Sequence, residues 1–438
     1  MKGYPKTIKN FSGLALPCII LALTVLISAC SPTRQLNKKL TELEQTYKYH
    51  LGVSVYDFDE KRKIVEWQDD RHFNPASNTK IYTLYACLHA MKDSLPGLAY
   101  RIVGDSLYFT GTGDPSFLHP EIPRSRVFEF LRNTDKYLVY HSVAGVDERY
   151  GPGWAWDDYN DYYQAEKSPF PLYGNVVRFT GNRGSIIQTD PAFWNTVLEN
   201  NGTKPGIVRD EFANVFRFRG SPLPPELRQD IPIKISDQVT VKLLNYSLGK
   251  EVLLKKDIIP GPVMTMFSVP ADTVYKLMMY DSDNMIAEHL LYSYATMNGL
   301  PLNTKKSIQH ALENVFVDMP DSLVWRDGSG LSRYNLFTPR TTVEVLKRML
   351  QQYPREKVFS YFPTGGQTGT IRYLFKESPL VVHAKSGSFS NNYCLSGYLY
   401  SKKGKLLIFS IMHNNFAYPI RDMQRVTEGI VRELYEKF

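Results

Sequence analysis

The sequence predicts a mixed α/β (α+β) protein in which a β-rich segment is inserted into a unit built from both ends of the chain. Strand-like segments and a helical pattern occupy residues 51–91, and further strands followed by a helix occupy residues 381–437. Between them, from about residue 98 to 262, short strand candidates alternate with turn-rich stretches. We therefore expect one domain at 31–95 and 265–438 that carries an inserted β-rich domain at 96–264.

The N-terminal part of the outer unit has clear local signals. A charged, amphipathic segment at 36–49 predicts a leading helix. Alternating segments at 51–58 and 62–67, separated by Asp59-Glu60-Lys61, predict a hairpin. A helical pattern then runs from Ser77 to about Met91, and its apolar residues share one face: Ile81, Leu84, Tyr85 and Leu88.

Helical texture returns at Ala271 and continues to the end of the chain. We expect helices at 272–280, 305–315 and 340–352. Strands are expected at 381–388, 394–401 and 405–413, and the last two are joined by a turn at Lys402-Lys403-Gly404. A final helix is expected at 420–437.

The first thirty residues predict an export signal. Lys2, Lys6 and Lys9 precede an apolar run of about 16 residues at 14–29, which is shorter than the roughly 20 residues of a membrane-spanning helix. The run ends in Ile27-Ser28-Ala29-Cys30, which resembles a bacterial lipoprotein cleavage box with Cys30 as the lipidated residue. We expect a periplasmic protein, anchored by lipid in the outer membrane of a Gram-negative-type bacterium. A simple secretory signal followed by an unrelated cysteine is the alternative.

Composition excludes several classes of function. The chain of 438 residues is 43% hydrophobic, which is enough for a large core and two or three domains. Without the leader it has 49 basic and 44 acidic residues, a net charge of about +5, and these charges are dispersed, so a nucleic-acid partner is not expected. Cys87 and Cys394 predict two buried thiols rather than a disulfide. No Cys/His cluster has metal-ligand spacing, and neither a metal nor another cofactor is expected.

Ser77-Asn78-Thr79-Lys80 is the first of three polar motifs that could carry chemistry. It follows the loop signal Asn74-Pro75-Ala76 and opens a helical pattern, so Ser77 and Lys80 are expected to be neighbours on one helix. The helix N-terminus favours a developing alkoxide, and a lysine with a lowered pKa can remove the hydroxyl proton. The plainer interpretation is a helix cap followed by a surface lysine. A second match, Ser247-Leu248-Gly249-Lys250, lies in a hairpin-like context that need not place both side chains on one face.

Ser282-Asp283-Asn284 is the second motif, at a break between two helical runs. There Ser282 could relay a proton from Lys80 to a leaving group, and the Asn284 amide could hold a substrate carbonyl. An ordinary cap of the following helix is the alternative, and Asp283 could be that cap in either case.

Lys385-Ser386-Gly387-Ser388 is the third motif and continues a strand. A glycine weakens a strand unless another backbone must come close, and a substrate peptide docking alongside would be such a backbone. Lys385 could lower the pKa of Lys80 by repulsion and, with Ser386, bind a terminal carboxylate. The backbone N–H groups of Ser77 and Ser388 would form an oxyanion hole. A bulged edge strand with an exposed lysine is the alternative. A similar stretch, Gln367-Thr368-Gly369-Thr370, lacks the cation.

In their order and spacing the three motifs resemble the class C low-molecular-mass penicillin-binding proteins, the D-alanyl-D-alanine carboxypeptidase/endopeptidase family. The resemblance extends to Gly113-Asp114-Pro115, to Asp327-Gly328-Ser329-Gly330-Leu331-Ser332 with Thr338-Pro339-Arg340, and to most of 271–415. The roughly 200 residues between the first two motifs suit the large insertion of this family. Ser386 stands where the family usually has threonine, but the hydroxyl is retained.

The resemblance implies a serine β-lactamase/DD-peptidase-like fold, with an antiparallel sheet flanked by helices. It implies Ser77 as nucleophile, Lys80 as base and Ser282 as relay, with Asn284, Lys385, Ser386, Gly387 and Ser388 in substrate binding. The implied partners are peptidoglycan stem peptides and, as covalent inhibitors, β-lactams. An esterase or β-lactamase and a non-catalytic peptidoglycan-binding scaffold are the alternatives. The sequence leaves open carboxypeptidase or endopeptidase preference, the role of the insertion and the oligomeric state.

Overall fold

The computed structural model describes residues 32–143, 146–182, 186–194, 196–199, 206–219, 225–376 and 380–438. The expected export signal and Cys30 lie outside these residues. Among the described helices, none is both long and apolar enough to cross a membrane.

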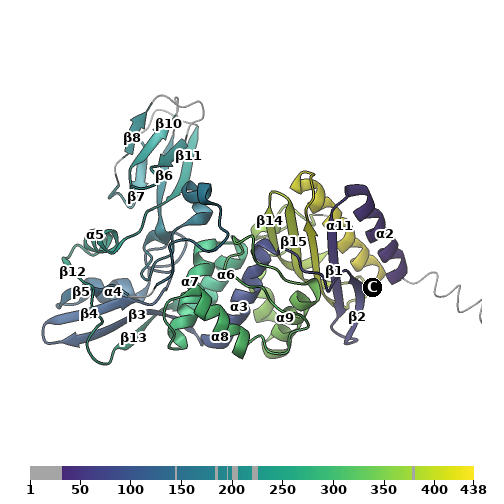
Figure 1. The fold of residues 1–438 in the computed structure, drawn as a ribbon, viewed down its shortest axis with the longest axis horizontal. Helices are drawn as coiled ribbons and strands as arrows, with labels where there is room; N and C mark the ends of the chain where they lie inside the picture. Colours follow the sequence, from purple (N-terminus) through teal and green to yellow (C-terminus); the bar gives the residue numbers. More distant parts are fainter. Residues whose placement is uncertain are drawn as a thin grey trace, which may run out of the picture.

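An antiparallel sheet of five strands joins the two ends of the chain (Figure 1). The N-terminal hairpin pairs with the C-terminal strands, with His50 opposite Asn414 and Asp57 opposite Leu407. The two ends of the chain thus share one sheet, and the middle of the chain leaves this sheet after β2 and returns to it at β14. The strand order is β14 (Val381–Phe389), β15 (Asn392–Tyr400), β16 (Leu406–Asn414), β1 (His50–Asp57) and β2 (Arg62–Trp67).

Helices cover both faces of this sheet because its central strands are apolar on both sides; every residue of β16 is buried. Helices α2 (Pro32–Tyr47) and α11 (Ile420–Lys437) pack on one face through residues such as Leu40 and Ile430. The other face meets α3 (Thr79–Ala90) and α9 (Pro339–Gln352). The predicted strands and the terminal helix are confirmed to within one or two residues at each end.

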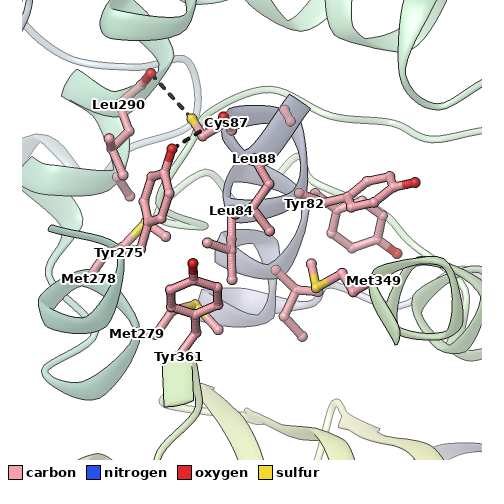
Figure 2. Packing of buried hydrophobic residues seen from close by; sticks show 14 of the residues in the cluster. Tyr82, Leu84, Cys87, Leu88, Tyr275, Met278, Met279, Leu290, Met349 and Tyr361 are labelled. Carbon is pink, nitrogen blue, oxygen red and sulfur yellow. Dashed lines mark hydrogen bonds between the residues drawn. The ribbon is translucent and has the colours of Figure 1, made fainter. Parts of the chain in front are cut away.

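Helix α3 is the centre of the molecule. The sequence predicted one apolar face, but every residue from Thr79 to Leu88 is buried. The reason is tertiary, because α6 (Ala271–Tyr280), α7 (Asn284–Met297) and α9 surround α3. Figure 2 shows Leu84 and Leu88 of α3 among side chains of these neighbouring helices. The Cys87 thiol donates a hydrogen bond to the Leu290 carbonyl of α7. Cys87 and Cys394 are both free and buried, as expected.

In the part that the structure describes, the insertion contains three smaller sheets. The first is a mixed sheet next to α6 and α7, covered by α4 (Arg126–Asn133) and α5 (Asp237–Leu248). Its strand order is β12 (Val252–Lys255), β5 (Tyr137–His141), β4 (Ser106–Gly111), β3 (Ser94–Val103) and β13 (Met264–Pro270). The other two stand further out (Figure 1) and contain β11 (Glu226–Pro232), β6 (Val176–Asn182) and β7 (Gln188–Asp190), and β8 (Thr196–Glu199), β10 (Phe216–Arg219) and β9 (Gly206–Arg209).

The remaining short elements connect these layers. Helices α8 (Thr304–Asn314) and α10 (Arg355–Tyr361) complete the helical layer. Among the described residues, 3₁₀ turns occur at η1 (Ala76–Asn78), η2 (Trp156–Asn160), η3 (Tyr162–Gln164), η4 (Tyr173–Asn175) and η5 (Gly369–Ile371).

The second Ser-x-x-Lys match lies at the end of α5, so the expected hairpin-like context is wrong. Gly249 has φ 66° and caps the helix in the left-handed conformation. The Ser247 hydroxyl donates a hydrogen bond to the Leu243 carbonyl, and the Lys250 ammonium group donates one to the Thr134 carbonyl. The two side chains therefore have separate partners and form no site together.

Candidate active site

A cleft of about 660 Å³ opens where η1, the break between α6 and α7, and the outer edge of β14 meet. A segment of the insertion, Ala155–Gln164, forms a further wall. All three sequence motifs reach this cleft, although they are separated by more than 300 residues along the chain. Its lining includes Ser77, Ser282, Asn284, Ser386, Gly387 and Ser388.

Ser77 lies in the 3₁₀ turn η1, immediately before α3, and not in the first turn of the α-helix. The preceding residue, Ala76, has a φ of 45°, an uncommon conformation for a residue with a Cβ and one that costs of order 1–3 kcal/mol. Gly330 packs so closely over this turn that a Cβ on it would overlap the Ala76 carbonyl. The turn is therefore held in a strained shape by tertiary contacts.

Lys80 is fully buried beneath Ser77, and its ammonium group has three acceptors. Nζ donates to Ser77 Oγ at 3.0 Å, to Asn284 Oδ1 at 2.6 Å and to the Ser329 carbonyl at 2.6 Å. Burial lowers the pKa of Lys80 to about 8, although carboxylates nearby oppose the shift. A substantial neutral fraction of Lys80 is therefore present near neutral pH.

Lys385 is also fully buried, on the first position of the third motif. Its Nζ donates to Ser282 Oγ at 2.9 Å and to the Ser386 carbonyl at 2.7 Å. Burial, and secondly repulsion from Lys80, holds the pKa of Lys385 well below its usual range. The sequence prediction named the same repulsion between the two lysines, with its effect on Lys80. For Lys80 the main cause is desolvation.

The second motif forms the expected break between α6 and α7. Ser282 has a φ of 59°, and Asp283 caps α7 by accepting a hydrogen bond from the Ile286 N–H at 2.8 Å. The Asn284 amide is fixed in one orientation, because its Nδ2 donates to the Tyr163 carbonyl at 2.9 Å while its Oδ1 faces Lys80. One N–H of the amide remains for another partner.

The third motif lies on the edge strand of the sheet. The outer edge of β14 is partly covered, because Ala384 N–H donates to the Pro363 carbonyl and Gly365 N–H to the Val382 carbonyl. Peptide groups alternate in direction along a strand, so the N–H groups of Ser386 and Ser388 also point outward. They face the cleft, where β14 is open.

Gly387 is required by the serine turn itself. A Cβ at this position would lie 2.7 Å from both the Pro75 carbonyl oxygen and the Ser77 nitrogen. The backbone that approaches Gly387 is therefore that of the Pro75–Asn78 turn, whereas the sequence predicted a substrate backbone in this position. The Asn78 amide adds to the contact by donating to the Lys385 carbonyl at 3.2 Å. Gly387 thus brings the first and third motifs together.

Thr370 is a cleft residue that the sequence argument did not select. Its stretch was set aside because it has no cation, yet Thr370 Oγ1 lies 2.6 Å from Ser386 Oγ and both line the cleft. Tyr163 was missed as well, because the turn-rich insertion showed no motif there. A hydroxyl beside a glycine is too common a signal to identify Thr370 from sequence.

A buried acidic layer lies behind Lys80. Glu288 Oε1 accepts from the Ser329 N–H at 2.8 Å, and the carbonyl of the same Ser329 accepts from Lys80. Burial raises the pKa of Glu288 to about 7. Asp327 accepts hydrogen bonds from Gly330, Ser332, Asn335 and Trp154, and so fixes the loop that carries Ser329.

Within the residues that the structure describes, no group of His, Cys, Asp and Glu could hold a metal ion. The chemistry available in the cleft is that of a serine hydroxyl, two desolvated amines and outward backbone N–H groups. In this site a serine at the start of a central helix is hydrogen-bonded to a buried lysine, and an edge strand that carries a second lysine lies beside them. This arrangement defines the class of active-site-serine peptidases and β-lactamases.

Within that class the family is shown by comparison. The family model of D-Ala-D-Ala carboxypeptidase 3 (S13) matches residues 33–201 and 239–434, and the chain belongs to this family of serine-type D-Ala-D-Ala carboxypeptidases. The match extends through most of the insertion and confirms the family resemblance predicted from the motifs.

Relatives of known name cover most of the chain. The chain is 23% identical over 422 residues to D-alanyl-D-alanine carboxypeptidase DacB of Haemophilus influenzae, covering 84% of this chain and 86% of that protein. It is 23% identical over 423 residues to penicillin-sensitive carboxypeptidase A of Dictyostelium discoideum, covering 82% and 81%. The crystal structure of penicillin binding protein 4 (dacB) from Haemophilus influenzae matches with a TM-score of 0.72 at 20% identity, covering 90% of this chain and 99% of that one. The predicted fold class is thereby confirmed.

Proposed function

We propose that Ser77 is the acylated nucleophile and that Lys80 is the base that activates it. Asn284 Oδ1 and the Ser329 carbonyl can only accept hydrogen bonds, and each lies 2.6 Å from Lys80 Nζ. They take both N–H groups of a neutral amine, so its lone pair is directed at Ser77 Oγ, 3.0 Å away. This orientation of the amine is the observation that carries the proposal.

The reaction begins when Ser77 Oγ attacks the carbonyl carbon of the penultimate D-Ala and its proton passes to Lys80. The N–H groups of Ser77 and Ser388 hold the developing oxyanion, and each such donor is worth roughly 10²–10³ in rate. The O–H of Ser282 is available to the leaving amine, because its oxygen accepts from Lys385. Ser282 relays the proton from Lys80 to that amine as the C–N bond breaks. Water then hydrolyses the ester and restores Ser77.

The remaining motif residues position the peptide. The substrate backbone lies along the open part of β14, and Asn284 donates its second N–H to a substrate carbonyl. The terminal carboxylate is held by Ser386, next to Thr370, in the positive field of Lys385. Gly387 keeps this strand against the serine turn.

The substrates in this proposal are peptidoglycan stem peptides that end in D-Ala-D-Ala, or their D-amino-acid cross-links, and β-lactams act as covalent inhibitors. Family membership supports the substrate class. The Haemophilus influenzae protein with this fold has also been solved in complex with a β-lactam. Such substrates require export, and we extend the proposal to cleavage before Cys30, lipidation of Cys30 and attachment to the periplasmic side of the outer membrane. Residues 96–264 form the inserted domain of this enzyme.

A fluorescent penicillin tests the proposal. The protein without its leader should form a long-lived adduct on Ser77, and Ser77→Ala should form none while keeping the same melting temperature. Absence of label on Ser77 contradicts the proposal. Rapid turnover of the penicillin instead indicates a β-lactamase or esterase. Sacculus binding without D-Ala release in the unmutated protein indicates a scaffold.

The two peptidase activities are separated by their products. Mass spectrometry of muropeptides after digestion should show tetrapeptides derived from pentapeptides for a carboxypeptidase. Loss of cross-linked dimers shows an endopeptidase.

A further inference from the structure

Three large aromatic side chains stand in solvent around the mouth of the cleft. Trp156 is 75% exposed, Tyr162 is 67% exposed and Tyr334 is 60% exposed. Trp156 lies between the cleft residues Ala155 and Asp157, and Tyr162 lines the cleft itself. Tyr334 directly follows Arg333, which is also a cleft residue.

Trp156 and Tyr334 belong to one rim although 178 positions separate them in the sequence. The Ser332 hydroxyl donates to the Pro152 carbonyl at 2.6 Å, and the Arg333 N–H lies 3.4 Å from the Gly153 carbonyl. The ring of Tyr334 rests on Gly153, where a Cβ would lie 2.8 Å from it. Two turn segments are thus tied together beside the cleft, each presenting an aromatic ring.

Such exposure suits a surface that a ligand covers. Removing an indole or phenol face from water is favourable, and aromatic residues concentrate at the sites that dominate binding. Trp156 has no ring or hydrogen-bond partner among the described residues, and its 3₁₀ turn η2 contains no buried residue. Its position is therefore not explained by packing.

The surface continues away from the cleft. Tyr162 also lines a neighbouring hollow of about 320 Å³, which contains Arg228, Gln229 and Asp230 of β11. A ligand longer than the peptide in the cleft can therefore pass over Tyr162 and along the insertion.

We propose that Trp156 and Tyr334 bind sugar rings of the glycan strand to which the stem peptide is attached, an inference that rests on the proposed function. A pyranose ring has an apolar C–H face that stacks on an aromatic ring, and hydroxyl groups around its edge. Asp157 and Asp158 beside Trp156 are acceptors for those hydroxyls.

Paired substrates test the rim. Trp156→Ala and Tyr334→Ala should lower kcat/KM about 3- to 10-fold, through KM, for a disaccharide-pentapeptide. Both variants should leave kcat/KM unchanged for the same pentapeptide without sugar. Trp156→Phe should retain most of the activity on the disaccharide-pentapeptide. Tyr137→Ala, at a 73% exposed position on β5, is the matched control and should change neither value.

The outcomes separate this inference from its rivals. An equal loss on both substrates shows that the rim belongs to the peptide cleft and overturns the inference. A loss confined to a glycan-free cross-linked peptide dimer shows a second stem-peptide site and also overturns it. Binding of (N-acetylglucosamine)₄ to Ser77→Ala, followed by tryptophan fluorescence and abolished by Trp156→Ala, tests the rim without catalysis. It keeps its meaning even if no D-Ala is released.

Discussion

The protonation of Lys80 should set the acid limb of the pH–rate profile, and Glu288→Gln should move that limb. Burial lowers the pKa of Lys80 to about 8. At pH 7 about one lysine in ten is then neutral, against about one in 3,000 at an ordinary pKa of 10.5, so burial raises the reactive population about 300-fold. Acylation should rise about tenfold per pH unit below pH 8 and level off above it.

Glu288 works against this shift, because its negative charge favours the ammonium form of Lys80. Glu288→Gln removes the charge and can still accept from the Ser329 N–H. The pKa of Lys80 should therefore fall where Glu288 is ionised, that is, above its own pKa of about 7. Acylation near pH 7.5 should become about twofold faster, and the difference should disappear below about pH 6, where Glu288 is neutral in the unmutated protein as well. Titratable groups around Glu288 that remain are Asp327, Lys167, Lys80 and Tyr292.

The assay is the second-order rate of labelling by a fluorescent penicillin from pH 5 to pH 10, in the unmutated protein and in Glu288→Gln. Stability gives an independent check. The pKa of Glu288 is raised from 4.5 to about 7, so the stability it contributes is complete below pH 4.5 and is lost as the pH rises through 7. Glu288→Gln should therefore gain melting temperature relative to the unmutated protein at pH 8 but not at pH 4. An acid limb that stays in place, or moves to higher pH, refutes the reasoning.

Three further predictions follow from single contacts. Gly387→Ala places a Cβ 2.7 Å from the Ser77 nitrogen and should slow penicillin acylation at least about 100-fold. The control Gly429→Ala in α11 has room for a Cβ and should keep full activity. Unchanged activity of Gly387→Ala would disprove the close approach. Asp327→Ala leaves three buried N–H donors and the partly buried Trp154 indole N–H without their acceptor. It should lower the free energy of unfolding by about 3–5 kcal/mol in chemical denaturation, and a loss below about 1 kcal/mol would count against that role. Thr370→Val removes the hydroxyl that hydrogen-bonds to Ser386 and should raise KM for a D-Ala-D-Ala peptide about 3- to 10-fold with little change in kcat. A fall in kcat alone would indicate that Thr370 has a chemical role instead.

Local patterns predicted much of this protein. Alternation identified the strands that became β1, β2, β14 and β16, and helical periodicity identified α9 and α11, because both depend on neighbours a few residues apart. The Asp283 cap was also readable from sequence, since it involves an N–H three residues away. The three motifs were found because their spacing within each motif is short.

Local patterns failed where distant segments meet. The burial of α3 on all sides depends on three helices that begin 181 residues or more after α3 ends. The 3₁₀ turn η1 requires the uncommon positive φ of Ala76, and Gly330, which packs against the Ala76 carbonyl, helps to keep the backbone in this conformation. Two further contacts join separate segments: Ser386 with Thr370, and Asn284 with Tyr163. The pattern of residues in one segment does not indicate which other segment it will contact.

The sequence by itself thus determined which groups can react and which segments form helices or strands. Whether those groups can act together was decided by the packed molecule. Only the tertiary structure removes water from Lys80 and Lys385, turns the Asn284 amide toward Lys80, and brings the Gly387 strand against the Ser77 turn. The physical reason is that desolvation and close backbone contact are properties of segments far apart in the chain.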